Sequence, residues 1–240
     1  MNSIKTILSS ISHRPYPLPT GSWSYYQEWN QVLFLHWKVP YEDLRNLLPQ
    51  KLTLDTFDGA CYISLVAFSM CRIRPKYFPA IPLISNFHEI NLRTYILNDN
   101  KPGVYFLNIE AEKSISVFIA KLLSGLPYEK ADIHRTGNVF VSNNASKVTS
   151  LDTTYTVSEK IKHKSALDRW LTERYSLYLD LQHHCYRYDI HHEEWPLSEV
   201  ETIHLNLNYN LGKIILTDLR PDLAHYSDGV KVISWSRQPA

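Results

Sequence analysis

Residues 87–97, FHEINLRTYIL, contain four side chains whose types suit the binding and conversion of a small carboxylate. Arg93 offers a planar set of N–H donors that matches a carboxylate. Glu89 can act as a general acid or base where poor solvation raises its pKa. Asn91 and Tyr95 add neutral hydrogen-bonding groups. These types predict a site in which Glu89 is catalytic, while Arg93, Asn91 and Tyr95 bind the substrate.

The spacing of these residues is that of one face of a β-strand, because side chains two residues apart point the same way. The opposite face carries Ile90, Leu92 and Ile96 and is mostly apolar. Such alternation is typical of an open sheet with one wet face, or of a barrel strand whose polar face lines the lumen. Because four residues of an extended strand span ~13 Å, Glu89 and Arg93 are not expected to pair directly.

The elements that must position this face are mostly strands, since aromatic and β-branched residues are frequent along the chain. Residues 103–112 are expected to form a hairpin with 87–97, and the polar stretch 142–150 is expected to be a mobile loop. No linker composition is visible, so we expect a single domain over residues 1–240. An N-terminal arm with a short amphipathic helix would cover 1–20, and a β-rich body 21–236. The fold class is α+β.

Three further segments have apolar residues at helical spacing between start and stop signals. The predicted helices are 40–49, 114–125 and 165–175. The last begins with Ser165 and Asp168 in the pattern of a capping box.

The composition excludes several classes of function. The formal net charge is +1 and no basic block occurs, so a nucleic-acid partner is not expected. No window of about 18 apolar residues indicates a membrane span. The first residues lack the continuous apolar core of a secretory signal, which favours a cytoplasmic protein. The three cysteines are widely spaced and indicate no disulfide framework.

Metal and cofactor motifs are equally weak. The stretch HHCYRYDIHHEE, residues 183–194, is rich in histidine, but adjacent histidines on a strand point to opposite faces. No HExxH or CxxC pattern is present, and no glycine-rich nucleotide motif occurs. His36 and His88 stand alone in apolar runs, which is typical of hydrogen-bonded core histidines. No metal and no cofactor are predicted.

An ordered set of segments covers roughly residues 13–235: FLHWKVP with LRNLLP behind it, LDTFDGACYISLVAF, FHEINLRTY, GVYFLNIEA, GLPYEKA, LTERYSLY and HHEEWPL. In this order they resemble the YqjF-like family of uncharacterised bacterial proteins. The resemblance implies a fold of the acetoacetate decarboxylase-like superfamily, a closed antiparallel β-barrel or cone that encloses a cavity, with about three helices outside. It also favours the lumen interpretation of the polar face.

Acetoacetate decarboxylases use a lysine amine that forms a Schiff base, after a motif that resembles SGLPYEKA here. Tyr128 and Glu129 stand where the family has its lysines, and Lys130 lies just beyond them. The departure at Tyr128 argues against a decarboxylase and makes this tyrosine a second catalytic candidate beside Glu89. A Schiff base at Lys130 remains as an alternative, provided that its amine points inward.

Two hypotheses of function follow. In the first, the barrel cavity binds a small carboxylate or carbonyl compound, with or without catalysis. In the second, the barrel is filled by side chains and an aromatic surface binds a partner, because sixteen tyrosines and six tryptophans could supply the anchors. A homo-oligomer is compatible with both.

Overall fold

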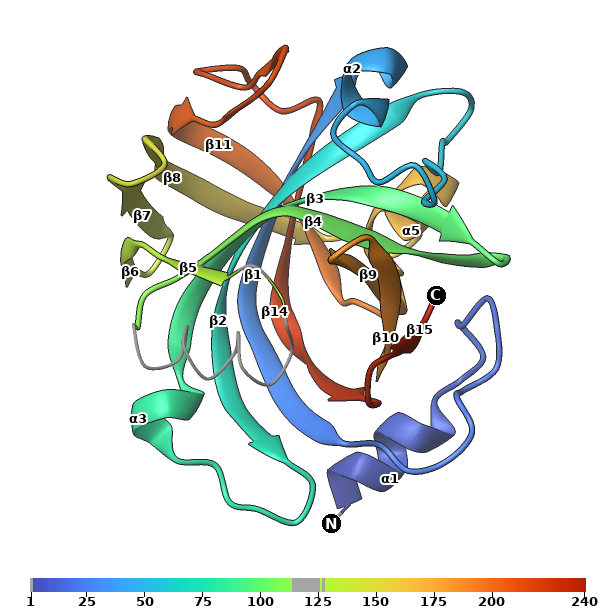
Figure 1. The fold of residues 1–240 in the computed structure, drawn as a ribbon. Coiled ribbons are helices and arrows are strands. Elements are labelled where there is room, and N and C mark those ends of the chain that lie inside the picture. The colour runs from blue at the N-terminus through green and yellow to red at the C-terminus, as the bar shows by residue number, and fades with distance from the viewer. Residues whose placement is uncertain (1, 114–125, 127) are drawn as a thin grey trace.

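The computed structural model describes residues 2–113, 126 and 128–240, and these residues form a strand-rich α+β structure (Figure 1). Its helices are α1 (Asn2–Ser9), α2 (Tyr41–Arg45), α3 (Pro82–Ser85) and α5 (Ala166–Thr172). Its strands are β1 (Tyr25–Val39), β2 (Cys61–Pro75), β3 (Phe87–Asn98), β4 (Lys101–Ala111), β5 (Tyr128–Lys130), β6 (Asp132–Thr136), β7 (Val139–Asn144), β8 (Thr149–Lys160), β9 (Ser176–Leu181), β10 (His184–His192), β11 (Leu197–Asn208), β12 (Asn210–Leu211), β13 (Ile214–Ile215), β14 (Leu223–Ser234) and β15 (Gln238–Pro239).

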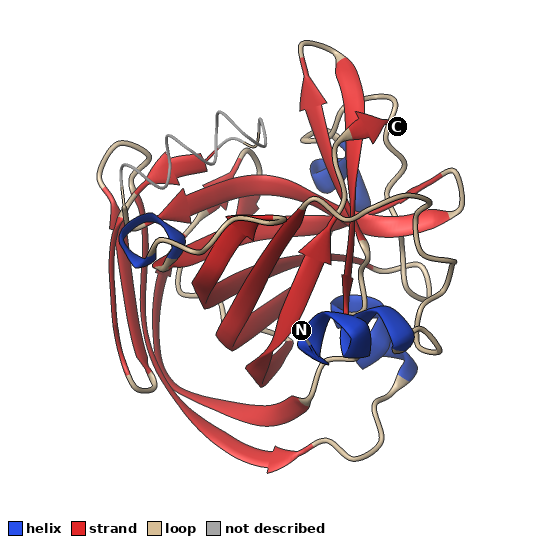
Figure 2. Cartoon of the chain, turned by 90° about the horizontal axis from the view of Figure 1, so that it is seen from below, coloured by secondary structure: helices blue, strands red, loops and turns tan. Residues whose placement is uncertain are grey.

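One large sheet contains 13 of the described strands, in the order β15-β10-β9-β4-β3-β2-β1-β14-β11-β8-β7-β6, with β5 beside β4. Strand β10 also pairs with β14, so the hydrogen-bonded path β14-β1-β2-β3-β4-β9-β10 returns to β14. In Figure 2 these strands curve strongly around one interior. Strands β11, β8, β7 and β6 continue the sheet beyond β14.

Two pairings correct the expectation of a wholly antiparallel sheet. Strand β4 runs parallel to β9 and parallel to β5. Both partners follow β4 through long connections rather than tight hairpins, and a long connection allows the chain to re-enter the sheet in the same direction.

The predicted hairpin of residues 87–97 and 103–112 is confirmed as β3 and β4. Asp99 and Asn100 connect the two strands with φ angles of 49° and 57°. Such left-handed residues twist a two-residue turn in the sense that the strands require, and Asp and Asn tolerate them. Alternation along β3 places Glu89, Asn91 and Arg93 on one face, and the pairing with β4 shifts by one residue between Leu92 and Arg93.

The helices agree in part with the prediction. The capping box before α5 is confirmed: Asp168 N–H donates to Ser165 Oγ over 3.0 Å, and Ser165 N–H donates to the Asp168 carboxylate over 2.7 Å. Helix α2 ends at Arg45, shorter than the expected 40–49. The N-terminal helix α1 buries Ile7. The helix expected at 114–125 lies outside the described residues. No helix within the described ranges is long and apolar enough to cross a membrane.

The stretch 142–150, expected to be a mobile loop, instead supplies the end of β7 and the start of β8. Its polar residues are held by the buried carboxylate of Glu110. Asn144 Nδ2 and Thr149 Oγ1 donate to Glu110 Oε1 over 3.1 and 2.6 Å. Ser142 and Asn144 are buried at the end of β7, whereas the turn at 145–148 between the two strands is exposed.

Both faces of β3 are buried. Ile90 and Leu92 belong to the main apolar cluster on one side. On the other side, Glu89, Arg93 and Tyr95 expose only 3, 8 and 0% of their surface. The interpretation that this polar face looks into bulk water is therefore wrong.

Gly103 permits the parallel contact between β4 and β9. A Cβ atom at this position would lie 2.5 Å from the Ser176 carbonyl oxygen and 2.7 Å from a ring carbon of Tyr178. We expect Gly103→Ala to lower the free energy of unfolding by about 1–3 kcal/mol, as overpacking does. Urea denaturation measures this value. Ser158→Thr, which adds one carbon at an exposed position of β8, serves as the control and should change little.

Candidate functional site

A cavity of about 200 Å³ lies against the polar face of β3. Its walls are mostly apolar, and they include Trp29, Phe34, Phe68, Met70, Phe106 and Trp195. A few polar side chains also reach it: Glu89, Asn91, Arg93, Tyr128, Arg174 and His192. An apolar cavity with a small number of convergent polar groups is typical of a small-molecule site.

Glu89 forms the centre of one polar group. Tyr128 donates its hydroxyl proton to Glu89 Oε2 over 2.9 Å, and Asn91 Nδ2 donates to Glu89 Oε1 over 3.2 Å. Burial raises the pKa of Glu89 to about 7, although both hydrogen bonds act against this rise. Burial and the neighbouring carboxylate raise the pKa of Tyr128 well above its usual value. Glu89 is thus poised to exchange a proton near neutral pH, while Tyr128 stays a neutral donor.

Arg93 lies two strand positions further along and has few acceptors. Its Nη2 donates to the Leu171 carbonyl over a long 3.5 Å, and its guanidinium lies 5.6 Å from the ring centre of Phe34. Its Nε has no hydrogen-bond partner among the described residues. Burial lowers the pKa of Arg93, as expected for a cation removed from water.

Arg174 follows α5 and brings a second guanidinium to the cavity. Its Nη1 forms an ion pair of 2.5 Å with Asp55, and its Nε donates to the Trp170 carbonyl over 2.6 Å. Its Nη2, like Arg93 Nε, has no partner within the described part of the chain. Burial lowers the pKa of Arg174, and the charge of Arg93 lowers it further. The two cations therefore lie close enough to repel each other.

Three buried polar atoms on the cavity-lining residues thus lack a partner among the residues described: Arg93 Nε, Arg174 Nη2 and Asn91 Oδ1. Two of them are cationic donors and one is a neutral acceptor. A buried polar atom without a partner costs free energy, so such atoms are rare unless something else satisfies them.

Tyr95, predicted to bind substrate, does not belong to the cavity wall. Its hydroxyl lies 3.0 Å from the Leu171 carbonyl oxygen and is also hydrogen-bonded to Ser64. Since Arg93 Nη2 donates to the same Leu171 carbonyl, Tyr95 lies behind Arg93 and holds the groups around it.

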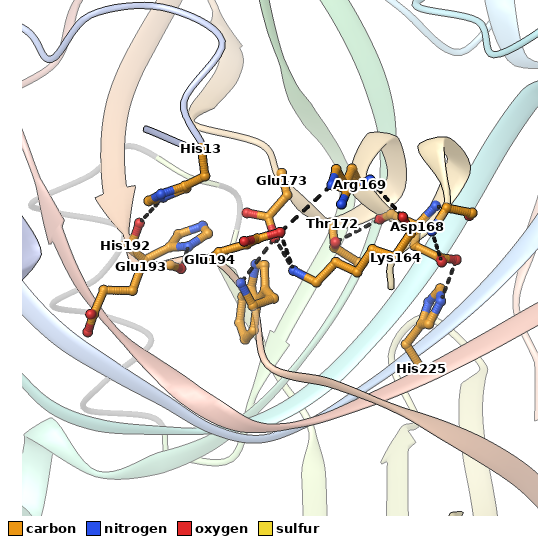
Figure 3. A network of polar contacts seen from close by, with 12 residues as sticks. His13, Lys164, Asp168, Arg169, Thr172, Glu173, His192, Glu193, Glu194 and His225 are labelled. Carbon is orange, nitrogen blue, oxygen red and sulfur yellow. Dashed lines mark hydrogen bonds and ion pairs between the residues drawn. The ribbon is translucent and has the colours of Figure 1, made fainter. Parts of the chain in front are cut away.

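A chain of hydrogen bonds continues from Ser64 away from the cavity. Ser64 Oγ contacts His36 Nδ1 at 2.6 Å, His36 Nε2 contacts His225 Nδ1 at 3.1 Å, and His225 Nε2 donates to Asp168 Oδ1 over 3.0 Å. Figure 3 shows its outer end, where His225 meets Asp168 below α5. Burial lowers the pKa of both histidines. His36 is confirmed as a hydrogen-bonded core histidine, but its partners were not predicted.

His192 and Glu173 form another unpredicted part of the site (Figure 3). His192 lines the cavity, and its burial lowers its pKa to about 4. Glu173 accepts hydrogen bonds from Lys164 Nζ over 2.9 Å and from the Trp195 backbone N–H over 3.0 Å. Burial alone would raise the pKa of Glu173, but His192 and Lys164 lower it below its usual value. These bonds hold Trp195 against the cavity.

We call the part of the cavity beside Arg93 and Arg174 the arginine end. Its residues Glu173 and Arg174 belong to the sequence segment LTERY, and nothing in the local pattern of this segment indicates a site. The signal that could have found them is the ordered resemblance, in which this segment was one of the matching motifs.

Lys130 is exposed at the end of β5 and does not line the cavity. None of the lysines within the described ranges does so. This placement contradicts a Schiff base at Lys130. No group of three or more histidine, cysteine or acidic residues in the described part of the chain is arranged to hold a metal ion.

A family model for the uncharacterized conserved proteins of DUF2071 matches residues 26–231. The chain belongs to the DUF2071 family. The chain is also 37% identical to the uncharacterized protein YqjF of Bacillus subtilis over 226 residues. The match covers 91% of this chain and 93% of that protein. The resemblance to the YqjF-like family is thereby confirmed.

Solved structures similar to this DUF2071 chain have the acetoacetate decarboxylase-like fold. An acetoacetate decarboxylase-like enzyme from Sphingomonas wittichii matches with a TM-score of 0.59 and 16% identity, over 96% of this chain and 99% of that one. The enduracididine biosynthesis enzyme MppR, complexed with pyruvate, matches with a TM-score of 0.60 and 11% identity, over 94% and 93%. Acetoacetate decarboxylase from Legionella pneumophila matches with a TM-score of 0.57 and 11% identity, over 98% and 95%. At these identities the similarity shows the fold alone.

The raised pKa of Glu89 makes a prediction about stability. Its folded-state pKa lies above the unfolded value, so its contribution to stability is complete below about pH 4.5 and is lost as the pH rises through about 7. Relative to Glu89→Gln, the wild type should therefore lose on the order of 3 kcal/mol of unfolding free energy between about pH 5 and about pH 8.

Urea denaturation of both proteins at the two pH values measures this difference. Glu159→Gln, the same change at an exposed residue of β8, should show no pH-dependent difference from the wild type. An equal pH dependence in wild type and Glu89→Gln would mean that Glu89 is solvated.

Proposed function

We propose that the protein binds a small carboxylate or carbonyl compound in the cavity beside β3, with Arg93 and Asn91 as binding residues and Glu89 and Tyr128 as the acid–base pair. The observation that carries this proposal is a pair of guanidinium donors, Arg93 Nε and Arg174 Nη2, that have no partner among the described residues. A carboxylate supplies two acceptor oxygens and one negative charge, which is what two neighbouring cations with one counter-ion lack.

The proposal includes a closed barrel around this cavity. Its support is the pairing of β10 with β14, which joins the two ends of the path β14-β1-β2-β3-β4-β9-β10. A closed wall excludes water from the arginine end, and low solvation strengthens the attraction between guanidinium and carboxylate.

The chemistry available to a bound ligand is proton transfer. The Tyr128 hydroxyl donates its single proton to Glu89 Oε2 on the cavity wall. When this hydroxyl turns to a ligand oxygen, the carboxylate is released to take a proton from a neighbouring carbon of the ligand. MppR, which shares the fold, was solved in complex with pyruvate, a short keto acid. That complex supports keto acids as the first compounds to test.

Arg93→Met separates a binding role from a structural one. Methionine keeps most of the apolar stem and removes an unpaired buried charge, so the ligand-free variant should be as stable as the wild type or more stable. Its binding of short keto acids should fall at least tenfold, because the charge-assisted hydrogen bonds are gone. Thermal shift and isothermal titration calorimetry measure the two quantities on the same samples.

Arg220→Met, at an exposed arginine, is the matched control and should leave both quantities unchanged. The proposal fails if no carboxylate or carbonyl compound stabilises the wild type while Arg93→Met lowers the ligand-free stability by several kcal/mol, because Arg93 would then be part of the core structure.

A second candidate function is a surface through which two copies of the chain associate. It is favoured by a cluster of large apolar side chains between β2 and β3, where Tyr77, Phe78, Ile81 and Leu83 are 87, 65, 55 and 71% exposed. In a two-fold interface such a cluster meets its own copy, which doubles the apolar surface removed from water. The cavity counts against the filled barrel that this hypothesis assumed.

Light scattering on a sizing column tests this candidate. A dimer that becomes a monomer in the double variant Tyr77→Ser/Phe78→Ser would support it. A monomeric wild type would contradict it and leave the cavity as the functional feature.

A further inference from the structure

Next to Arg93 and Arg174, the cavity is lined by aromatic side chains, and these indicate which kind of ligand fits beside the charges. Phe34 lies under Arg93, and its ring meets the edge of Trp195 at 5.2 Å between ring centres. Trp195 stacks on Trp29 at 6.1 Å, and Trp29 contacts Phe68 at 5.8 Å. All four rings line the cavity. Together Phe34, Trp195, Trp29 and Phe68 form an aromatic box next to the guanidinium groups.

The register of the strands explains why the polar and apolar parts are separated. Paired residues on neighbouring strands share a face, and Arg93 pairs with Ser64, which pairs with His36. The next rows toward the other end of the cavity carry Val66 with Phe34, and then Phe68. On β1 and β2, this face of the sheet therefore changes from polar residues to apolar residues between one set of paired residues and the next.

The four rings contact one another in a row and also face the free volume of the cavity. A well-packed interior has few voids larger than a water molecule, so an aromatic box beside about 200 Å³ of free space is not ordinary core packing. An apolar cavity of ~150 Å³ accommodates benzene. The space is thus sufficient for one six-membered ring together with a carboxylate, and it is larger than a three-carbon acid requires.

From these observations we infer that the ligand is an aryl carboxylate: a single aromatic ring, held in the box of Phe34, Trp195, Trp29 and Phe68, joined by a short linker to a carboxylate that binds Arg93 and Arg174. This inference rests on the proposed function, because it uses the same arginine end, and it adds the class of the ligand. Aromatic rings stack on or meet each other edge-on at the centroid distances seen in the box. Asn91 Oδ1, the remaining unpartnered atom, favours a hydroxyl or enol donor between the ring and the acid.

The test compares three probes by isothermal titration calorimetry with the wild type. Pyruvate has the acid without the ring, phenylpyruvate has both, and phenylacetone has the ring and carbonyl without the acid. We expect phenylpyruvate to bind about tenfold to a hundredfold more tightly than pyruvate, as burial of a ring predicts. Phenylacetone should bind at least tenfold more weakly than phenylpyruvate.

Phe68→Trp fills the box and leaves the charged end intact, because residue 68 pairs with Glu89, ~13 Å along the strand from the Arg93 row. It should remove the advantage of phenylpyruvate and leave the affinity for pyruvate unchanged. Phe78→Trp, the same change on the exposed loop, is the control and should preserve the advantage.

The outcomes separate the inference from the proposed function. Equal affinity for pyruvate and phenylpyruvate would overturn the aryl inference and leave carboxylate binding intact. An advantage that persists in a folded Phe68→Trp variant would also overturn it, because the ring would then bind elsewhere. No binding of any of the three probes would overturn both.

Discussion

A buried guanidinium group needs acceptors for its N–H donors and a nearby negative charge. The buried arginines of this chain differ in how many of these partners they have. Arg187 is buried against Asp189, with two N–H···O bonds to its carboxylate of 3.0 and 3.5 Å. Arg174 has Asp55. Arg93 has one long bond to a carbonyl and an aromatic face. Among the described residues, no carboxylate of the cavity wall is paired with the guanidinium of Arg93.

The acid on the same strand face does not remove the deficit. Glu89 is held by Tyr128 and Asn91, and strand geometry places it two alternations away from Arg93. Its burial favours the protonated form, so even its charge is weakened. One strand therefore presents an acid and a base in a single enclosure without allowing them to cancel. This separation keeps the guanidinium of Arg93 and the carboxyl of Glu89 from forming an ion pair with each other.

Alternation in residues 87–97 was sufficient to predict the strand, its hairpin and the shared face of Glu89, Asn91 and Arg93, because these depend on local period and turn chemistry. It could not show that Tyr95 lies behind Arg93, since that depends on how β3 passes α5. It also could not show that Asn144 and Thr149, at the two sides of the exposed turn 145–148, bind a buried carboxylate, because that carboxylate, Glu110, comes from a distant strand. The contribution of Arg174 depends likewise on the packing of α5, and only resemblance to a family marked its segment.

The departure at Tyr128 from the lysine motif changes what the common fold can do. Tyr128, which stands where the resemblance implies a lysine, holds a phenol against the carboxylate of Glu89. A phenol cannot form a Schiff base, but it can donate a proton to a carbonyl oxygen. The similarity to these solved structures concerns the fold, and the chemistry of a chain depends on its site rather than on its architecture.

The histidine chain behind Arg93 has a direction. Asp168 as a carboxylate can only accept, so His225 Nε2 carries the proton there, and a neutral His225 must accept at Nδ1. His36 then donates from Nε2 and accepts at Nδ1 from Ser64, so Ser64 must in turn accept from Tyr95. Tyr95 also donates to the Leu171 carbonyl over 3.0 Å, so its single phenolic proton is shared between the Ser64 hydroxyl and that carbonyl. Arg93 therefore shares the Leu171 carbonyl with a phenol that stands at the inner end of a row of five hydrogen-bonded side chains, which begins at Asp168.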